Sequence, residues 1–256
     1  MANEIDQRSA ALAAHEIEHG KILAERQPEA AWGWDTLAGR LRARRRAEMI
    51  IRGAGLTRGM RVLEIGCGTG NFTRLFAKSG ASILAVDISP DLLDRARQRG
   101  LPPEQVQFVC KRFEECEIDG PFDAVVGSSV LHHLDVDTAL AKVYRLLRPG
   151  GVLSFAEPNM LNPQVFAERK FRFFRKLFWY VSPDETAFVR SGLARQIEAA
   201  GFEQVQVAPF DWMHPALPRP LVRTVRNLGT LIESLPLTRE FAGSLYIRAR
   251  RPDRTR

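Results

Sequence analysis

Apolar residues in the middle of the chain alternate between short continuous runs and longer stretches with helical spacing. The short runs are predicted to be strands, over Arg61–Ile65, Ile83–Val86, Val106–Cys110, Phe122–Val126 and Val152–Ala156. Between them apolar residues recur every three or four positions, as in Leu140, Val143 and Leu147, which is the spacing of one helix face. Strands that alternate with amphipathic helices indicate a parallel sheet covered on both faces.

The flanks of this alternation also carry helical patterns. Residues 1–57 are expected to form an N-terminal helical extension, with a turn at Trp32 and Trp34 between its helices. Residues 58–256 are expected to form one α/β domain with a cap insertion over 157–182 and a second helical insertion near 210–240. Ser89, followed by Pro90 and Asp91, is predicted to cap a helix after the second strand. Ser182 begins a capping box with Pro183, which predicts a helix from there to Gly201. Strands over 205–208 and 244–249 complete a doubly wound, mostly parallel, seven-stranded sheet.

A glycine-rich loop follows the first predicted strand. It contains Gly66, Gly68 and Gly70, and Asp87 ends the second strand 87 − 66 = 21 residues after the first glycine. Open α/β sheets bind ligands at the carboxyl ends of their strands, and an acid at this distance suits the ribose hydroxyls of an adenosine-containing ligand. A dinucleotide fingerprint would require glycine where this chain has Asn71. The loop therefore favours an adenosine ligand without a pyrophosphate.

Four segments in a fixed order resemble the motifs of class I S-adenosylmethionine (SAM)-dependent methyltransferases. These are Glu64–Gly70, Ala85–Ser89, Phe122–Val126 with Val130–Leu134, and Leu147–Gly151. The resemblance covers about residues 60–157 and, with less force beyond them, is similar to the small-molecule and lipid-quinone branch of the family. It implies a Rossmann-like methyltransferase fold, SAM as cosubstrate and no metal.

The resemblance also implies roles for individual residues. The loop residues are expected to contact the methionine part of SAM, with Glu64 at its amino group and backbone contacts from Gly66, Cys67, Gly68 and Gly70. Asp87 would bind the ribose and Ile88 would lie against the adenine. The family often has an acid after the third strand, where this chain has Lys111-Arg112-Phe113-Glu114. Either Glu114 takes the place of that acid with a shifted register, or only backbone contacts hold the adenine. Arg112 and Phe113 there, and Ser128 after the fourth strand, complete the expected cofactor site.

Methyl transfer requires mainly alignment, so a catalytic base is not obligatory. His133 has the side chain best suited to accept a proton near neutral pH, although a loop histidine can equally bond the backbone. Glu157 follows the fifth strand, where it would either contact an acceptor or bond backbone amides at the start of the insertion. Both residues are candidate bases.

Aromatic and basic residues share the segment Gln164–Tyr180 within the cap insertion. Placed on a helix, its apolar and charged residues fall on opposite faces, with Lys170 and Trp179 breaking the pattern. Three interpretations compete: an ordinary packed helix, a roof over an apolar acceptor, or peripheral contact with an anionic membrane surface.

The net charge of +7 attracts anionic partners without choosing among them. The basic run Arg40–Arg46 is interpreted first as a solvated helix face. No secretory signal, long apolar span or metal-ligand cysteine spacing is present, which predicts a cytoplasmic protein. The predicted function is methyl transfer from SAM to a small apolar or amphiphilic acceptor. The alternatives are an RNA methyltransferase, disfavoured because no RNA-binding module is recognisable, and a non-catalytic SAM-binding protein.

Overall fold

The computed structural model describes residues 2–170 and 187–253, with the backbone alone over residues 2–12. Within these residues seven strands form one sheet in the order β3-β2-β1-β4-β5-β7-β6. The strands are β1 (Arg61–Ile65), β2 (Ser82–Asp87), β3 (Val106–Cys110), β4 (Phe122–Ser128), β5 (Leu147–Pro158), β6 (Glu203–Phe210) and β7 (Ser244–Arg250). Neighbours among β1 to β5 pair in parallel, whereas β7 is antiparallel to β5 and β6. The predicted seven-stranded, mostly parallel sheet is confirmed.

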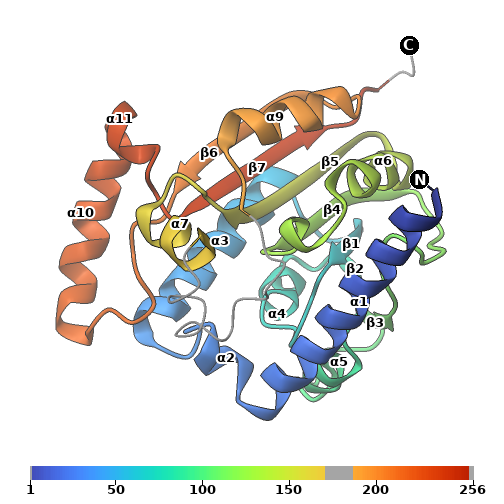
Figure 1. The fold of residues 1–256 in the computed structure, drawn as a ribbon, viewed down its shortest axis with the longest axis horizontal. Helices are drawn as coiled ribbons and strands as arrows, with labels where there is room; N and C mark the ends of the chain where they lie inside the picture. The colour runs from blue at the N-terminus through green and yellow to red at the C-terminus, as the bar shows by residue number, and fades with distance from the viewer. Residues whose placement is uncertain (1, 171–186, 254–256) are drawn as a thin grey trace.

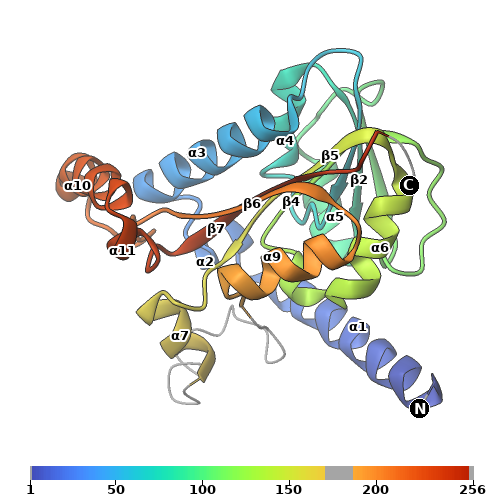
Figure 2. The same cartoon turned by 90° about the horizontal axis from the view of Figure 1, so that it is seen from above.

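Helices cover both faces of the sheet because successive strand residues point to opposite sides. In β1, Val62 joins a buried cluster with Ile50 of α3, whereas Leu63 joins the cluster that contains Leu140 of α6. Figure 2 shows α3 and α4 on one side of the sheet and α6 and α9 on the other. The helices of these two layers are α3 (Leu37–Ala54), α4 (Thr73–Phe76), α5 (Pro90–Arg97), α6 (Val136–Leu146) and α9 (Arg190–Ala199), with short 3-10 turns η1 (Ala77–Ser79) and η2 (Leu131–His133).

Two N-terminal helices precede these layers. Helix α1 (Ala2–Glu25) runs beside α5 at one edge of the fold, and α2 (Pro28–Ala31) leads into the turn before α3 (Figure 1). The contact between α1 and α5 is close, because a Cβ added at Gly20 would lie 2.5 Å from Ser89 Oγ. Ser89 is also the N-cap of α5, where its Oγ accepts a hydrogen bond from Leu92 N (3.3 Å), as the sequence predicted.

Of the helix expected from Ser182 to Gly201, the structure describes residues 187–201. Helix α9 starts at Arg190, and Phe188 forms an isolated parallel bridge with Asn159. Met160 N donates to Phe188 O (2.9 Å) and Phe188 N donates to Pro158 O (3.2 Å). These bonds hold Phe188 in an extended conformation, so the predicted helix is wrong over residues 187–189, while residues 182–186 lie outside the described part.

The remaining helices lie between β5 and β7. They are α7 (Pro163–Lys170), η3 (Arg219–Leu221), α10 (Val222–Ser234) and α11 (Pro236–Arg239). The described part of the predicted cap helix, residues 164–170, is helical, and residues 171–180 lie outside the described range. In the described part of the chain no helix is both long and apolar enough to cross a membrane.

Candidate functional site

The glycine loop lies at the carboxyl end of β1, next to β4, where the order of the strands reverses. Gly66, Gly68 and Gly70 all have positive φ angles (66°, 51° and 73°), which glycine adopts without strain. Gly66 N donates to Val86 O (2.8 Å), which ties the loop to β2. A Cβ at Gly66 would lie 2.3 Å from Val130 Cγ2, whereas one at Gly68 would find only Trp32, at 3.9 Å. Gly68 therefore presents its backbone to open space.

Asp87 is held against this loop from the end of β2. Its Oδ2 accepts a hydrogen bond from Gly68 N (2.7 Å) and its Oδ1 accepts one from Ser89 N (2.9 Å). Burial raises the pKa of Asp87 above its ordinary value, although the two N–H donors act in the opposite direction. The carboxylate thus joins the loop to the start of α5 and still has acceptor capacity for ligand hydroxyls.

Glu64 lies one layer deeper, beneath the loop. Its side chain is buried, and its Oε2 has no hydrogen-bond partner among the described residues. Burial, together with the negative charge of Asp87, raises the pKa of Glu64 to about 8. An unpartnered buried carboxyl oxygen is costly, which suits a site that a cationic ligand group completes.

Arg46 reaches the same end of the sheet from α3. Its Nη1 donates to Ser129 Oγ (2.9 Å) and Ser128 Oγ (3.2 Å), and its Nη2 donates to Ser244 Oγ. Arg46 is 3% exposed and forms no ion pair with a carboxylate of the described residues. Burial, and then the charge of Arg42, lower the pKa of Arg46 to about 10. The interpretation of residues 40–46 as a solvated face is therefore wrong for Arg46, since tertiary packing covers it.

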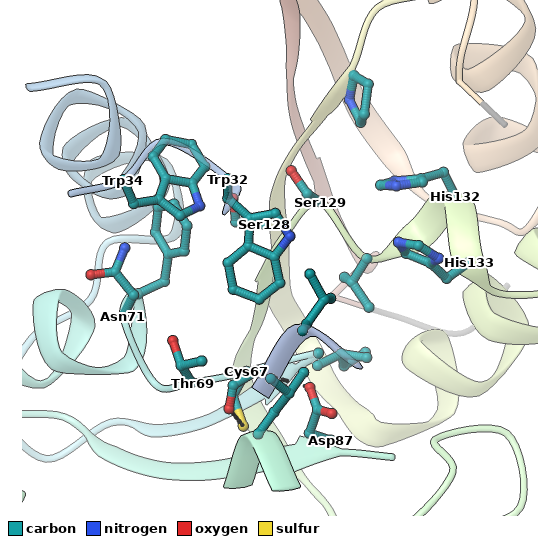
Figure 3. Close-up of a pocket in the computed structure, with 18 of the residues that line it drawn as sticks. Trp32, Trp34, Cys67, Thr69, Asn71, Asp87, Ser128, Ser129, His132 and His133 are labelled. Atoms are coloured by element: carbon teal, nitrogen blue, oxygen red, sulfur yellow. Dashed lines mark hydrogen bonds between the residues drawn. The ribbon is translucent and has the colours of Figure 1, made fainter. Parts of the chain in front are cut away.

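The glycine loop, Asp87 and Arg46 line a cavity of about 400 Å³. In Figure 3, Trp32 and Trp34 lie on one side of it, His132 and His133 lie on the other, and Cys67 and Asp87 are at its base. Helix α1 adds lining residues that the sequence pattern did not indicate, among them Glu16 and Leu23. Glu16 Oε1 lies 3.2 Å from His133 Nδ1, so α1 contacts the opposite wall.

Glu157 is positioned behind this wall. Its Oε1 accepts hydrogen bonds from Val130 N (2.9 Å) and Leu131 N (3.0 Å), and its Oε2 lies 2.6 Å from His132 Nδ1. Burial would raise the pKa of Glu157, but His132 and the two backbone donors outweigh it and hold that pKa below its ordinary value. The side chain of Glu157 is completely buried and does not line the cavity, and the backbone amides that it bonds follow β4 and do not belong to the start of the insertion.

The structure brings most of the predicted site residues to one cavity. Those that line it are Gly66, Cys67, Gly68, Asp87, Ile88, Arg112, Phe113, Ser128 and His133. Glu64, Gly70 and Glu157 do not line it. Gly70 packs the loop on α5, since its Cβ would lie 3.1 Å from Ala96 Cβ. His133 lies toward Asp87, whose pKa its charge lowers, and thus near the glycine-loop end of the cavity.

The far end of the cavity is formed by segments that follow β5 and β6. Its apolar and aromatic members are Pro158, Val165, Trp212, Met213 and Pro215, and its polar members include Arg42, Gln164, Glu168, Asp211 and His214. Arg42 Nε donates to Asp211 Oδ2 (2.7 Å), so this end holds a buried ion pair. The cavity thus joins a glycine-loop end with a mixed apolar and polar end.

Known proteins resemble this chain in sequence and in architecture. A family model described as a methyltransferase domain matches residues 63–153. A ubiquinone biosynthesis O-methyltransferase of Aromatoleum aromaticum is 33% identical over 168 residues, which cover 63% of this chain and 71% of that protein. A protein of the same description from Xanthomonas oryzae is 38% identical over 113 residues, 43% of this chain and 47% of that protein. The chain thus spans about half the length of that relative.

Solved structures show the same fold at low identity. A SAM-dependent methyltransferase from Thermotoga maritima matches with a TM-score of 0.61 and 18% identity, over 91% of this chain and 99% of that one. Haemonchus contortus phosphoethanolamine N-methyltransferase 2, solved with SAM, matches with a TM-score of 0.59 and 17% identity, over 81% and 52%. The chain belongs to the class I SAM-dependent methyltransferases. The predicted family and fold are confirmed.

Proposed function

We propose that this protein transfers the methyl group of SAM to a small apolar or amphiphilic acceptor. The observation that carries the proposal is the single cavity that runs from the glycine loop and Asp87 to a partly aromatic end at Trp212 and Met213. Such a cavity can hold a donor and an acceptor side by side, which is the alignment that methyl transfer needs. The names of two relatives, a ubiquinone biosynthesis enzyme and a 2-methyl-6-phytyl-1,4-hydroquinone methyltransferase of Synechocystis, support an acceptor of this class.

The cofactor end offers a partner for each polar part of SAM. Asp87 would accept hydrogen bonds from the ribose hydroxyls. Glu64 lies beneath the loop and outside the cavity lining, so once ionised it would hold the ammonium group through a water. Arg46 would bind the carboxylate, because it is a buried cation without an acidic partner among the described residues. Ile88 and Phe113 would lie against the adenine.

The reaction itself is a displacement at carbon. A lone pair of the acceptor atom attacks the methyl carbon, the carbon–sulfur bond breaks, and S-adenosylhomocysteine leaves with that electron pair. An acceptor hydroxyl or ammonium also loses a proton. Glu157 is buried behind η2 and His133 lies toward Asp87, and neither is needed as the base for this proton. Solvent can accept the proton, or the acceptor can ionise before it binds.

The test is the fate of a labelled methyl group. The purified protein is incubated with methyl-labelled SAM and a cell extract, and the label is counted in organic-soluble, RNA and protein fractions. We expect label in the organic-soluble fraction and none above background with Asp87→Ala. Label in RNA would favour the RNA methyltransferase alternative. SAM binding without label in any fraction would favour a non-catalytic SAM-binding protein.

A membrane role for residues 164–180 also stays a proposal, because only 164–170 are described. Reversal of Arg172, Arg175 and Lys176 to Glu would lower binding to anionic vesicles if this segment docks there.

A further inference from the structure

The chain between β6 and β7 leaves the sheet and returns to it. Pro215 and Gly243, near the two ends of this excursion, both line the cavity. Between them, η3, α10 and α11 form an arm at the edge of the molecule, seen at the far left in Figure 1. One side of α10 packs inward, where Val222 and Gly229 are buried and Glu233 pairs with Arg45. The arm is therefore a fixed part of the fold next to the site.

The outer side of this arm carries a row of exposed leucines. Leu221, Leu228, Leu231 and Leu235 are spaced by seven, three and four residues, which places them on one side of a helix. They are 50%, 50%, 60% and 50% exposed, and Leu237 of α11 is 83% exposed. We call these five residues the leucine face. A run of large exposed apolar side chains marks an interaction surface on an otherwise ordinary protein.

The solvent-exposed charges of the arm are all positive. Arg219, Arg223 and Arg226 are exposed, and Arg223 and Arg226 lie away from the leucines on the wheel of α10. The two carboxylates of residues 219–241 are both ion-paired, Glu233 with Arg45 and Glu240 with Arg190 (2.6 Å). A helix with leucines on one side and arginines on another, and no exposed acid, has the pattern of helices that lie in an anionic lipid interface.

The arm also adjoins an opening of the cavity. Gln164 and His214 line the cavity and are exposed, so the acceptor end reaches the surface there. Asn162, another lining residue, donates through Nδ2 to Phe241 O (2.8 Å), just after α11. Phe241 itself is 47% exposed. Exposed apolar surface thus runs from α11 toward the edge of this opening.

We propose that the leucine face docks the protein on an anionic lipid bilayer and so places the acceptor opening at the membrane surface. An amphiphilic acceptor could then pass from the lipid into the cavity without crossing water. The proposal deepens the proposed function and depends on it only for what enters the cavity. A second copy of this chain is the competing occupant, and the oligomeric state of the protein in solution distinguishes it from the bilayer.

The test measures binding of the full chain to vesicles without any methyl donor, so that its outcome is separate from that of methyl transfer. The probes are vesicles of phosphatidylcholine alone and of phosphatidylcholine with phosphatidylglycerol, and the readout is co-sedimentation. The variants are Leu231→Ser with Leu235→Ser, and Arg223→Glu with Arg226→Glu. The matched control is Arg58→Glu with Arg145→Glu, because these exposed arginines lie at the opposite, amino end of the sheet.

The wild type should bind the anionic vesicles, and the leucine variant should bind about tenfold more weakly. The arginine variant should lose binding in step with the anionic lipid content, and the control variant should bind like the wild type. The proposal is overturned if the wild type does not sediment with anionic vesicles, or if these variants bind as it does. It is also overturned if only charge reversal at Arg172, Arg175 and Lys176 abolishes binding. A dimer in solution that the leucine variant disrupts, without vesicle binding, would assign the face to a second copy.

Discussion

Arg46 offers the sharpest test of how the cofactor end works. Replacement by Met keeps most of the side-chain length and removes the charge. If the guanidinium holds the SAM carboxylate, the variant loses a charge-assisted hydrogen bond of about 1.5–3 kcal/mol, which corresponds to about a 10- to 150-fold weaker Kd. Calorimetric titration with SAM and with S-adenosylhomocysteine measures this change, and both ligands should be affected because both carry the carboxylate.

The same substitution should affect folding much less. Met removes a buried cation that has no acidic partner among the described residues, which relieves a desolvation cost. It also deprives the hydroxyls of Ser128, Ser129 and Ser244 of a donor, which acts in the opposite direction. We therefore expect a melting temperature near that of the wild type without ligand, and a strongly reduced rise of that temperature when SAM is added.

Arg42→Met is the matched control, because Arg42 lies one helical turn earlier and lines the same cavity. Its removal leaves buried Asp211 without its ion-pair partner, so this variant should lose stability while its SAM affinity changes little. If Arg46→Met folds and binds SAM with wild-type affinity, the carboxylate does not lie at Arg46 and the assignment is refuted.

Three further outcomes are expected. Since the pKa of Glu64 is raised to about 8, the carboxyl is mostly protonated at pH 7, and binding of the SAM ammonium should release a proton. Equal binding heats in buffers of different ionisation enthalpy would contradict this release. Gly68→Val should abolish SAM binding in a folded protein, whereas Gly66→Val should also lower the melting temperature because its side chain would meet Val130; a Gly66→Val variant as stable as Gly68→Val would argue against this packing. The lowered pKa of Glu157 means that its ionised form stabilises the fold above the ordinary carboxyl pKa, and this contribution is lost as the pH falls through the lowered value. Glu157→Gln should therefore cost about 1–3 kcal/mol of unfolding free energy at pH 7, and less in acid, when unfolding is measured with denaturant. If the stability cost of Glu157→Gln did not change with pH, the charge of Glu157 would not be its cause.

The strands and the glycine loop could be predicted from sequence because their signals are local. Arg61–Ile65 and Val106–Cys110 were predicted with the bounds that the structure has, since a run of apolar residues between turn signals leaves little choice. Ser89 was predicted as a helix cap, and its hydroxyl does accept the bond from Leu92 N. Local chemistry fixes such features before any tertiary contact forms.

The helix predicted from Ser182 is wrong over residues 187–189 for a reason of the opposite kind. A capping box states where a helix can begin, but the backbone of Phe188 is engaged by Pro158 and Met160, some thirty residues earlier in the chain. Glu157 shows the same limit, because it lies inside β5 and not after it, and the donors at Val130 and Leu131 decided what it does. Long-range hydrogen bonds outweighed local preference in both cases.

The sequence by itself thus determined the family, the order of elements and the cofactor signature at Gly66, Gly68 and Asp87. Only the tertiary structure decided which charges are buried and what covers the site. Residues 40–46 read as one basic helical run, yet packing against β4 and β7 buries Arg46 while Arg44 stays exposed. Helix α1 forms one wall of the cavity, although its own sequence pattern did not indicate a role in ligand binding. The physical reason is that periodicity gives the faces of an element, whereas the contacts of each face depend on distant segments that the pattern does not encode.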